Sequence, residues 1–255
     1  MLRRRIIPAL LMRDGGLVKT EKFSKERYIG DPINAVKIFN EKEVDELCLL
    51  DIGATAEGRS PAYTEISEIV SEAFMPIGYG GGIHSMAHVE QLFKIGVEKV
   101  IMNTAAFENE HLVKQAASVF GNQSIVVSID IKKDLWGQYR IYTRSGKSKQ
   151  KIDIITAVER IQDLGAGEII LNNIDRDGTM QGFDLDLINK VAKMIDVPLV
   201  ALGGAATIND LVAGVQHGAT AVAAGSMFVF HGVHKAVLIS YITSDQLEIS
   251  LHSNK

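Results

Sequence analysis

Residues 198–226, PLVALGGAATINDLVAGVQHGATAVAAGS, contain the pattern that decides the fold. An apolar run at 198–203 is followed by a helical pattern at 207–217 and then by a second apolar run. Thr207 is a typical helix N-cap residue, and Gly218 is the residue type most common just past a helix end. Runs that are apolar throughout are typical of parallel strands covered on both faces. The stretch therefore predicts a strand–helix–strand unit.

The same alternation runs through the whole chain. Apolar runs predict strands at residues 5–11, 46–52, 76–80, 99–103, 124–130, 168–173, 198–203 and 220–226. Amphipathic segments predict helices at residues 31–42, 62–73, 85–95, 108–119, 152–164, 184–194, 207–217 and 232–242. Residues 134–145 alternate like a β-hairpin after the fifth strand. Eight such units predict a single (β/α)8 TIM barrel domain covering residues 1–255, with a doubly wound open sheet as the alternative.

The composition excludes several classes of protein. Hydrophobic residues make up 46% and charged residues 23% of the chain, which excludes disordered and coiled-coil proteins. The net charge of -4 argues against a nucleic-acid partner, and no apolar run reaches the ~18 residues of a membrane span. The basic start, MLRRRIIPAL, is too short in apolar residues for a signal peptide, and the single cysteine, Cys48, suits a reducing compartment. We expect a cytoplasmic protein without nucleic-acid or membrane partners.

The two halves of the chain resemble each other. The glycine pair at residues 81–82 recurs at residues 203–204, a shift of 122 positions. At the same shift, residues 103–104 fall on residues 225–226. Such self-similarity at a fixed period predicts two half-barrels related by internal duplication.

Glycines and small polar residues follow several predicted strands, at the ends that meet at the mouth of a barrel. Glycine turns expose N–H groups and helix starts add positive potential, so both bind oxyanions. One cradle comprises Gly82, Asn103 and Thr104, and the other comprises Gly178, Gly204, Gly225 and Ser226. Two cradles related by the repeat predict a small ligand with a phosphate at each end. Glycines that only make tight turns are the alternative.

Asp130 ends a predicted strand at the mouth, where acid–base catalysis takes place in such barrels. A turn or capping role is the alternative. At a shift of 119 positions the repeat places Leu11 opposite Asp130, where a symmetric acid–base pair needs a second carboxylate. A leucine cannot transfer protons. Lys19, in the first loop, either reaches an anionic substrate or is an ordinary solvated lysine.

Four charged residues stand immediately before apolar runs: Arg5, Glu46, Lys99 and Glu168. Two cations and two anions at matched strand starts could close a ring at the barrel bottom, because buried charges must be paired. Ordinary solvated strand ends are the alternative. We expect no metal and no cofactor, since His84 and His88 have i, i+4 spacing without an evident third ligand.

Several short stretches together carry a family resemblance. They are RII at residues 5–7, GDP at 30–32, DELCLLDI at 45–52, GGGIH at 80–84, NTAA at 103–106, SIDIK at 128–132, GAGEI at 165–169, IDRDGT at 174–179 and GGA at 203–205. With these stretches the chain resembles, along nearly its full length, the cyclase subunit of imidazole glycerol phosphate synthase. The stretch IDRDGT is the most specific of them.

The resemblance implies a (β/α)8 barrel that binds a substrate with two phosphates. It also implies a glutaminase partner subunit at the barrel bottom, with ammonia passing through the barrel. It assigns the ammonia gate to Arg5, Glu46, Lys99 and Glu168, and so replaces the solvated alternative for these four. It assigns substrate and phosphate binding to Lys19, Asp51, Gly82, Asn103, Thr104, Asp177, Gly178, Gly204 and Ser226.

The chain departs from the family at three positions of the mouth. The family uses two aspartates as acid and base, and Asp130 matches one while Leu11 occupies the position of the other. Asn172 stands where the family has threonine, and Leu202 where it has serine. Since each proton-transfer group contributes about 10²–10⁴-fold in rate, the missing carboxylate puts the activity in question.

Three functions are compatible with these features. The first is a working lyase of histidine biosynthesis, which uses ammonia to form imidazole glycerol phosphate, with Asp130 acting alone or with Asp51 or a water. The second is a divergent paralogue with weak or no cyclase activity that conducts ammonia to a separate synthetase in surface-sugar amidination. The third is the sister phosphoribosyl isomerase, which needs both aspartates and no charged ring. Leu11 favours the second.

Overall fold

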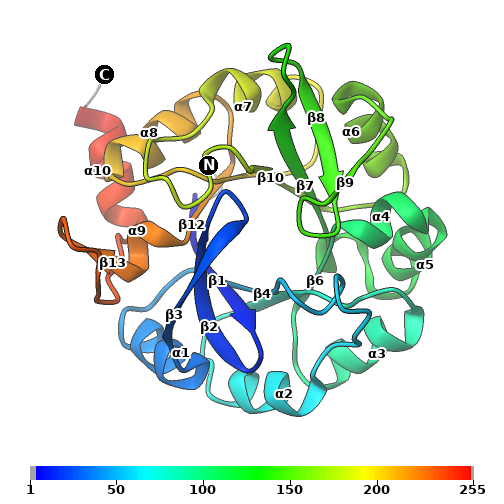
Figure 1. Ribbon diagram of the computed structural model, residues 1–255, viewed down its shortest axis with the longest axis horizontal. Helices are drawn as coiled ribbons and strands as arrows, with labels where there is room; N and C mark the ends of the chain where they lie inside the picture. Colours follow the sequence, from blue (N-terminus) through cyan, green and yellow to red (C-terminus); the bar gives the residue numbers. More distant parts are fainter. Residues whose placement is uncertain (1–3, 254–255) are drawn as a thin grey trace.

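The computed structural model describes residues 4–253, and residues 1–3 and 254–255 of the predicted domain lie outside the described part. Its centre is a closed barrel of parallel strands (Figure 1). In ring order the strands are β1 (Arg5–Arg13), β4 (Leu47–Asp51), β5 (Ile77–Gly80), β6 (Lys99–Met102), β7 (Ile125–Lys133), β10 (Glu168–Asn173), β11 (Leu199–Leu202) and β12 (Ala221–Ala224). Because β7 pairs with β10 and β12 pairs with β1, the ring is closed. The predicted barrel is confirmed, and the open-sheet alternative is wrong.

Helices surround the barrel (Figure 1). They are α1 (Pro32–Glu41), α2 (Tyr63–Ser71), α3 (Met86–Lys94), α4 (Thr104–Glu108), α5 (Glu110–Phe120), the 3-10 turn η1 (Asn122–Ser124), α6 (Ile154–Asp163), α7 (Leu185–Ala192), α8 (Ile208–Gln216), α9 (Ser226–Val229) and α10 (Ser244–Ser253). The predicted cap at Thr207 is confirmed, and Asp210 completes a capping box with it. Gly218, just past α8, has φ +110, a conformation that glycine adopts without steric cost.

The predicted helix at residues 232–242 is wrong. The segment forms a small hairpin of β13 (Phe230–His231) and β14 (Ala236–Val237). Gly232 and Lys235 both have positive φ, and the Lys235 N–H donates to the Gly232 carbonyl at 3.0 Å, which closes a tight turn. Val233 is 97% exposed, so the apolar positions in this segment do not form one helix face against the core.

Two antiparallel hairpins extend from the carboxyl ends of β1 and β7 (Figure 1). The hairpin predicted at residues 134–145 is confirmed by the antiparallel pairing of β7 with β8 (Tyr139–Thr143), whose turn lies at residues 134–138, and β9 (Ser148–Lys149) then pairs with β8. The segment containing Lys19 is a second hairpin, of β2 (Gly16–Glu21) and β3 (Ser24–Gly30), rather than a simple loop. The two hairpins follow the first and the fifth barrel strand, so they occupy matching places in the two halves.

The repeat seen in the sequence is also present in the backbone. Asn103 and Gly225 precede the short helices α4 and α9 with nearly equal angles, φ -110 and ψ -79 against φ -105 and ψ -71. At the same shift of 122 positions, Gly58 and Met180 both have positive φ, +68 and +58. These shared turns fit the duplication inferred from the sequence.

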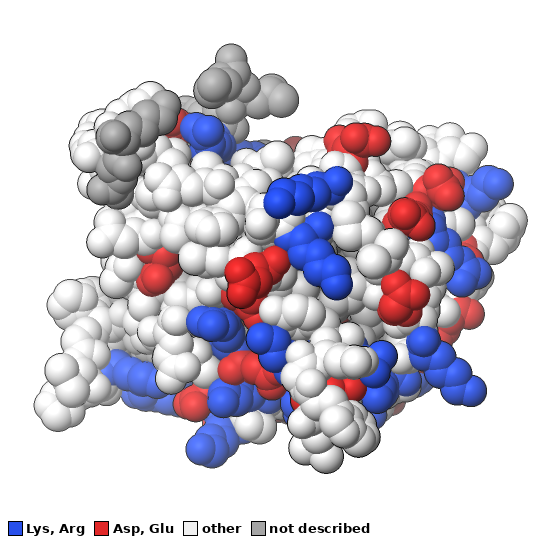
Figure 2. Space-filling model, turned by 90° about the horizontal axis from the view of Figure 1, so that it is seen from above, with Lys and Arg blue, Asp and Glu red and all other residues white. Residues whose placement is uncertain are grey.

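Side chains alternate between the inside and the outside of the barrel along each strand. The inward apolar residues form a cluster of their own: Ile7, Ala9, Cys48, Ile101, Val126, Ile170, Val200, Leu202, Ala221 and Ala223. The outward residues pack against the helices in the larger core. On the outer surface, Lys, Arg, Asp and Glu are interspersed over the face seen in Figure 2. Within residues 4–253, none of the helices is both long and apolar enough to cross a membrane.

Candidate active site

A cavity of about 270 Å³ opens at the carboxyl ends of the barrel strands. Most of the residues predicted from the sequence line it: Lys19, Asp51, Gly82, Asn103, Thr104, Asp130, Asp177, Gly225 and Ser226. Gly178 and Gly204 line a smaller adjoining pocket, which shares Asp177, Gly225 and Ser226 with the cavity. The structure thus brings together the residues of both predicted cradles around one space. Pockets of this kind, concave and with a few convergent polar groups, are the usual ligand sites.

Asp130 is a buried carboxylic acid on the cavity wall, with only 7% of its surface exposed. Burial raises the pKa of Asp130 to about 7, although weak hydrogen bonds from Asn172 and Ser128 favour the charged form. Asn172 Nδ2 lies 3.4 Å and Ser128 Oγ 3.3 Å from Asp130 Oδ1. A carboxyl group with a pKa near neutrality exchanges protons readily at physiological pH, which is the property of a general acid or base.

Leu11 lines the same cavity on β1, as the repeat predicts. The nearby carboxylate of Asp51 is already engaged: its Oδ1 accepts from the N–H groups of Gly53 and Ala54, both at 2.9 Å, and its Oδ2 pairs with Arg59 at 3.4 Å. Asp51 therefore shapes the loop after β4. Its bonds argue against its acting as the second acid–base group.

Lys19 and Asp177 form a second polar centre at the cavity. Lys19 is buried, and burial lowers its pKa to about 8 while the Asp177 charge acts in the opposite direction. Its Nζ donates to the Ala9 carbonyl at 2.6 Å and lies against Gly225, where a side chain would collide with it. Burial likewise raises the pKa of Asp177 to about 6, and the neighbouring Lys19 and Thr20 limit the rise. Lys19 therefore belongs beside the second cradle.

The first cradle is a glycine turn braced from outside. Gly82 has φ +69, and a side chain there would meet the Arg59 carbonyl at 2.5 Å, so only glycine fits. Its N–H donates to Thr55 Oγ1 at 3.1 Å. Nδ1 of His84 and Nδ1 of His88 each lie 3.1 Å from the Gly82 carbonyl oxygen, and the two rings stack edge to face. These histidines support the turn, a role that their spacing in the sequence did not suggest.

The second cradle also depends on close backbone approach. A side chain at Gly204 would collide with the Gly182 carbonyl, and one at Gly178 with the Thr20 carbonyl. Both glycines have positive φ, +113 and +71. These glycines are therefore needed for tight turns, as the alternative inferred from the sequence states. The same turns also place Gly178 and Gly204 at the wall of the smaller pocket.

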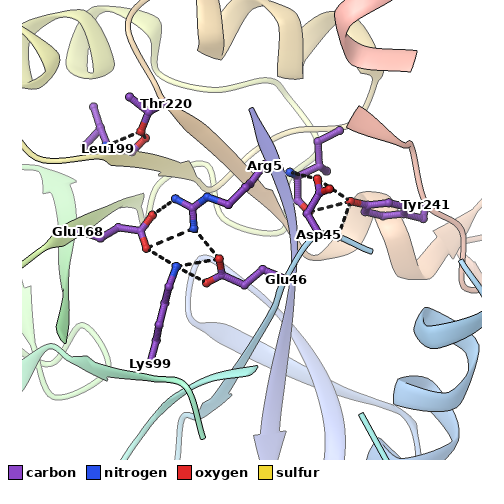
Figure 3. Close-up of polar contacts among 9 residues, drawn as sticks. Arg5, Asp45, Glu46, Lys99, Glu168, Leu199, Thr220 and Tyr241 are labelled. Carbon is purple, nitrogen blue, oxygen red and sulfur yellow. Dashed lines mark hydrogen bonds and ion pairs between the residues drawn. The ribbon is translucent and has the colours of Figure 1, made fainter. Parts of the chain in front are cut away.

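The four charged residues at the strand starts close a ring (Figure 3). Lys99 Nζ lies 2.8 Å from both Glu46 Oε2 and Glu168 Oε2, and Arg5 completes the ring by pairing with the same two glutamates. Burial alone raises the pKa of Glu168, but Arg5 and Lys99 outweigh it and hold that pKa below its ordinary value. Both glutamates are buried, so these are not solvated strand ends.

Apolar side chains fill the barrel between the ring and the cavity. On β10 the inward positions run from Glu168 in the ring, through Ile170, to Asn172 at the cavity. On the other strands this middle layer includes Cys48, whose thiol pKa is raised by burial. The layer is rich in alanine on β1 and β12, at Ala9, Ala221 and Ala223.

Sequence reasoning missed several polar residues of the cavity. Ser128, Thr55 and Lys147 line it, and Ser145 does so from the turn between β8 and β9. Period-2 alternation on β7 could have identified Ser128, which lies two positions before Asp130. No cluster of three or more potential metal ligands is present among the described residues.

The fold and the cavity place the chain in the class of (β/α)8 barrels whose site lies at the carboxyl ends of the strands. Residues 5–235 match the model of a family described as histidine biosynthesis protein. Since this match covers most of the sequence, the chain belongs to that family.

Three relatives sharpen the placement. The chain is 49% identical over 250 residues to a Pseudomonas aeruginosa protein provisionally named imidazole glycerol phosphate synthase subunit hisF2, covering 98% of the chain and 100% of the relative. It is 52% identical to the provisionally named subunit hisF3 of Vibrio vulnificus, over 94% of each protein. It is 47% identical to the provisionally named subunit HisF of Leptospira interrogans, over 97% and 98% of the two chains. The resemblance inferred from the sequence motifs is thus confirmed at the level of the family.

Proposed function

We propose that this chain is the synthase subunit of a glutamine amidotransferase, which receives ammonia from a glutaminase subunit at the barrel bottom and uses it at the mouth. The observation that carries this proposal is the succession of three layers along the same strands. A ring of paired charges closes the bottom, apolar side chains fill the middle, and Asp130 lies in the cavity at the top. Neutral ammonia crosses an apolar layer more readily than ammonium, because a charge pays a large desolvation cost.

The reaction that fits this layout is that of histidine biosynthesis. Ammonia attacks the phosphoribulosyl formimino ribotide, and ring closure and cleavage give imidazole glycerol phosphate, aminoimidazole carboxamide ribotide and one molecule of water. The two cradles would hold the two phosphates, and Asp130 would transfer the proton. The Oδ1 atom of Asn172 supports this assignment, because it is buried at the cavity wall without a hydrogen-bond partner among the described residues. It is free to accept a hydrogen bond from the incoming nitrogen.

Leu11 favours a second candidate function. It places an apolar side chain at the cavity where the repeat calls for a carboxylate, and Asp51 is held by its own loop. In this second role the barrel conducts ammonia to a separate synthetase, in the amidination of surface sugars, and has weak or no cyclase activity. Both candidates share the glutaminase partner and the ammonia route, and they differ in the chemistry at the mouth.

A turnover assay separates the two candidates. Purified protein is given an ammonium salt and the phosphoribulosyl formimino ribotide, and imidazole glycerol phosphate is measured. Formation at a rate comparable to that of a working synthase supports the first candidate and rules out the second. Absence of product, with binding of the ribotide retained, supports the second. Neither candidate stands if the protein fails to bind the ribotide and fails to associate with a glutaminase subunit.

We also propose a cytoplasmic location and one domain for the whole chain. A single buried cysteine fits a reducing compartment. The barrel strands extend from residue 5 to residue 224, and α10 packs against α8, so the last helix is part of the same body. Fractionation of the cells and limited proteolysis of the purified protein test these two points.

A further inference from the structure

Residues 144–147 (RSGK), here called the strap, connect β8 to β9 beside the cavity. Its residues Arg144, Ser145 and Gly146 have successive φ values of +53, +55 and +78. The left-handed region is costly for residues other than glycine, and such strain persists only where surrounding contacts fix it. Strained segments of this kind cluster at ligand clamps and active sites.

The contacts that fix the strap come from three other parts of the mouth. The Arg144 N–H donates to Thr104 Oγ1 at 3.0 Å, and its guanidinium binds Glu108 on α4 at 2.7 and 2.9 Å. Ser145 Oγ donates to the Ile52 carbonyl, after β4, at 2.8 Å. Gly146 lies under the Phe23 ring of the β2–β3 hairpin, 3.0 Å from where a Cβ would be. The strap is thus tied directly to Thr104 of the first cradle.

Lys147 brings a cation to this tied segment. It lines the cavity together with Asn103 and Thr104. Among the ion pairs of residues 4–253, none involves Lys147. The other lysine of the cavity, Lys19, lies against Gly225 of the second cradle. Lys19 therefore lies beside the second cradle, and Lys147 belongs to the strap that is tied to the first cradle. In each case the hairpin follows the first strand of the opposite half-barrel.

The segment around Lys147 is strongly basic. Residues 132–151 contain seven lysines and arginines and one aspartate, in a chain whose net charge is -4. A local excess of cations beside a cavity raises the local concentration of anionic ligands. Three of these cations, Lys133, Arg140 and Arg144, are held in ion pairs with Asp184, Asp134 and Glu108, whereas Lys147 lines the cavity. The remaining charge and the strap geometry are independent observations, and both favour an anion at this end of the cavity.

We propose that Lys147 is a ligand of the phosphate held by the first cradle, and that the strap positions it there. The inference rests on the bis-phosphate ligand proposed above and names a binding residue for one of its two ends. An ammonium group offers three donors and a compact charge, and charge-assisted bonds to phosphate are about twice as strong as neutral ones. The other members of this cradle, Gly82, Asn103 and Thr104, are neutral, so Lys147 supplies its charge.

The test compares Lys147→Gln with Lys149→Gln, using inorganic phosphate as the probe in a calorimetric titration of the full chain. Lys149 lies two positions away on the same hairpin, and its loss changes the net charge equally, but it does not line the cavity. We expect Lys147→Gln to weaken phosphate binding about tenfold and Lys149→Gln less than twofold. Lys147→Arg retains the charge and should bind within about threefold of the unchanged protein.

A double-mutant cycle with Thr104→Val locates the phosphate. Coupled, non-additive losses are expected if Thr104 and Lys147 hold the same anion. Equal effects of the Lys147 and Lys149 variants, or strictly additive losses in the cycle, would overturn the proposal, and both results leave the proposed function intact. Conversely, phosphate binding can show coupled losses in a protein that neither forms imidazole glycerol phosphate nor conducts ammonia. That combination would retain Lys147 as a phosphate ligand and overturn the proposed function. Melting curves confirm that each variant is folded.

Discussion

Asn172 and Asp130 are direct partners in the pairing of β10 with β7, and the Asn172 amide lies 3.4 Å from the Asp130 carboxyl oxygen. The pair places a polar group beside the acid at the level where the cavity begins. The amide helps the charged form of Asp130, but burial has the larger effect and leaves the pKa near 7. The reactivity of the acid is therefore set mainly by how little water reaches it.

Replacing Asp130 by Asn should abolish any cyclase turnover. Removal of a proton-transfer group costs about 10²–10⁴-fold in rate, while the amide retains the shape of the side chain. The measurement is imidazole glycerol phosphate formed with saturating ammonium. Ser128→Ala is the matched control, since it removes only a weak bond to the same carboxyl group. Equal rates for Asp130→Asn and the unchanged protein would exclude Asp130 as the catalytic group.

The same substitution should make stability less dependent on pH. A carboxyl group whose pKa rises on folding, from 3.8 to about 7, binds its proton more tightly in the folded state. Its protonation stabilises the folded state fully below pH 3.8, and this stabilisation declines as the pH rises and is lost above about pH 7. At pH 8 we expect Asp130→Asn to be more stable than the unchanged protein by about 1–3 kcal/mol in urea unfolding. The gain should disappear near pH 4, and the exposed Asp196→Asn should show none at either pH.

Replacing Leu11 by Asp should restore a second carboxylate to the cavity. If the missing acid–base partner alone limits the reaction, turnover with ammonium should rise about 10²-fold or more. Leu11→Asn is the control, because asparagine has nearly the shape of aspartate but cannot exchange an acidic proton. A gain shared by both variants would point to cavity size instead. The absence of any gain would mean that Asn172 or Leu202, which line the same cavity, also blocks the chemistry.

Replacing Glu168 by Gln should destabilise the barrel bottom. Glu168 is 4% exposed and pairs with both Arg5 and Lys99, so its loss leaves two cations underneutralised. We expect a loss of about 2–4 kcal/mol at pH 7. Because its pKa is lowered on folding, the ion pairs stabilise the protein above pH 4.5 and lose their effect as the pH falls below it. The exposed pair of Lys37 and Glu72 offers the control, and Glu72→Gln should cost less than about 1 kcal/mol.

Replacing Ala223 by Leu should obstruct the interior of the barrel. Ala223 is a buried member of the inward apolar layer, where added methylenes have little room. With a glutaminase subunit present, glutamine-supported turnover or ammonia delivery should fall about tenfold or more. Activity supported by external ammonium should change little, because that ammonia enters from the mouth. The control is Ala213→Leu on the outer helix α8. A parallel fall of both activities would indicate damage to the cavity rather than to the route.

The strands and the position of the site could be predicted from the sequence because their signals are local. Buried parallel strands are mostly apolar, so runs such as residues 199–202 (LVAL) reveal them, and their carboxyl ends define the mouth. The helix expected at residues 232–242 was wrong because apolar spacing alone does not show whether a core face exists to receive it. The hairpin containing Lys19 was missed because β2 is short and β3 is polar and exposed, so neither strand has a strong sequence pattern.

The sequence by itself determined the barrel, its two similar halves, and the identity of many of the residues that line the mouth, since each follows from periodicity or from short motifs. Only the tertiary structure decided how those residues act. The pairing of Arg5 and Lys99 with two glutamates joins strands far apart in the chain, and the pKa of Asp130 depends on burial from all sides. The ion pairs and the pKa both depend on distances between residues that are far apart in the sequence, and only the folded chain brings those residues together.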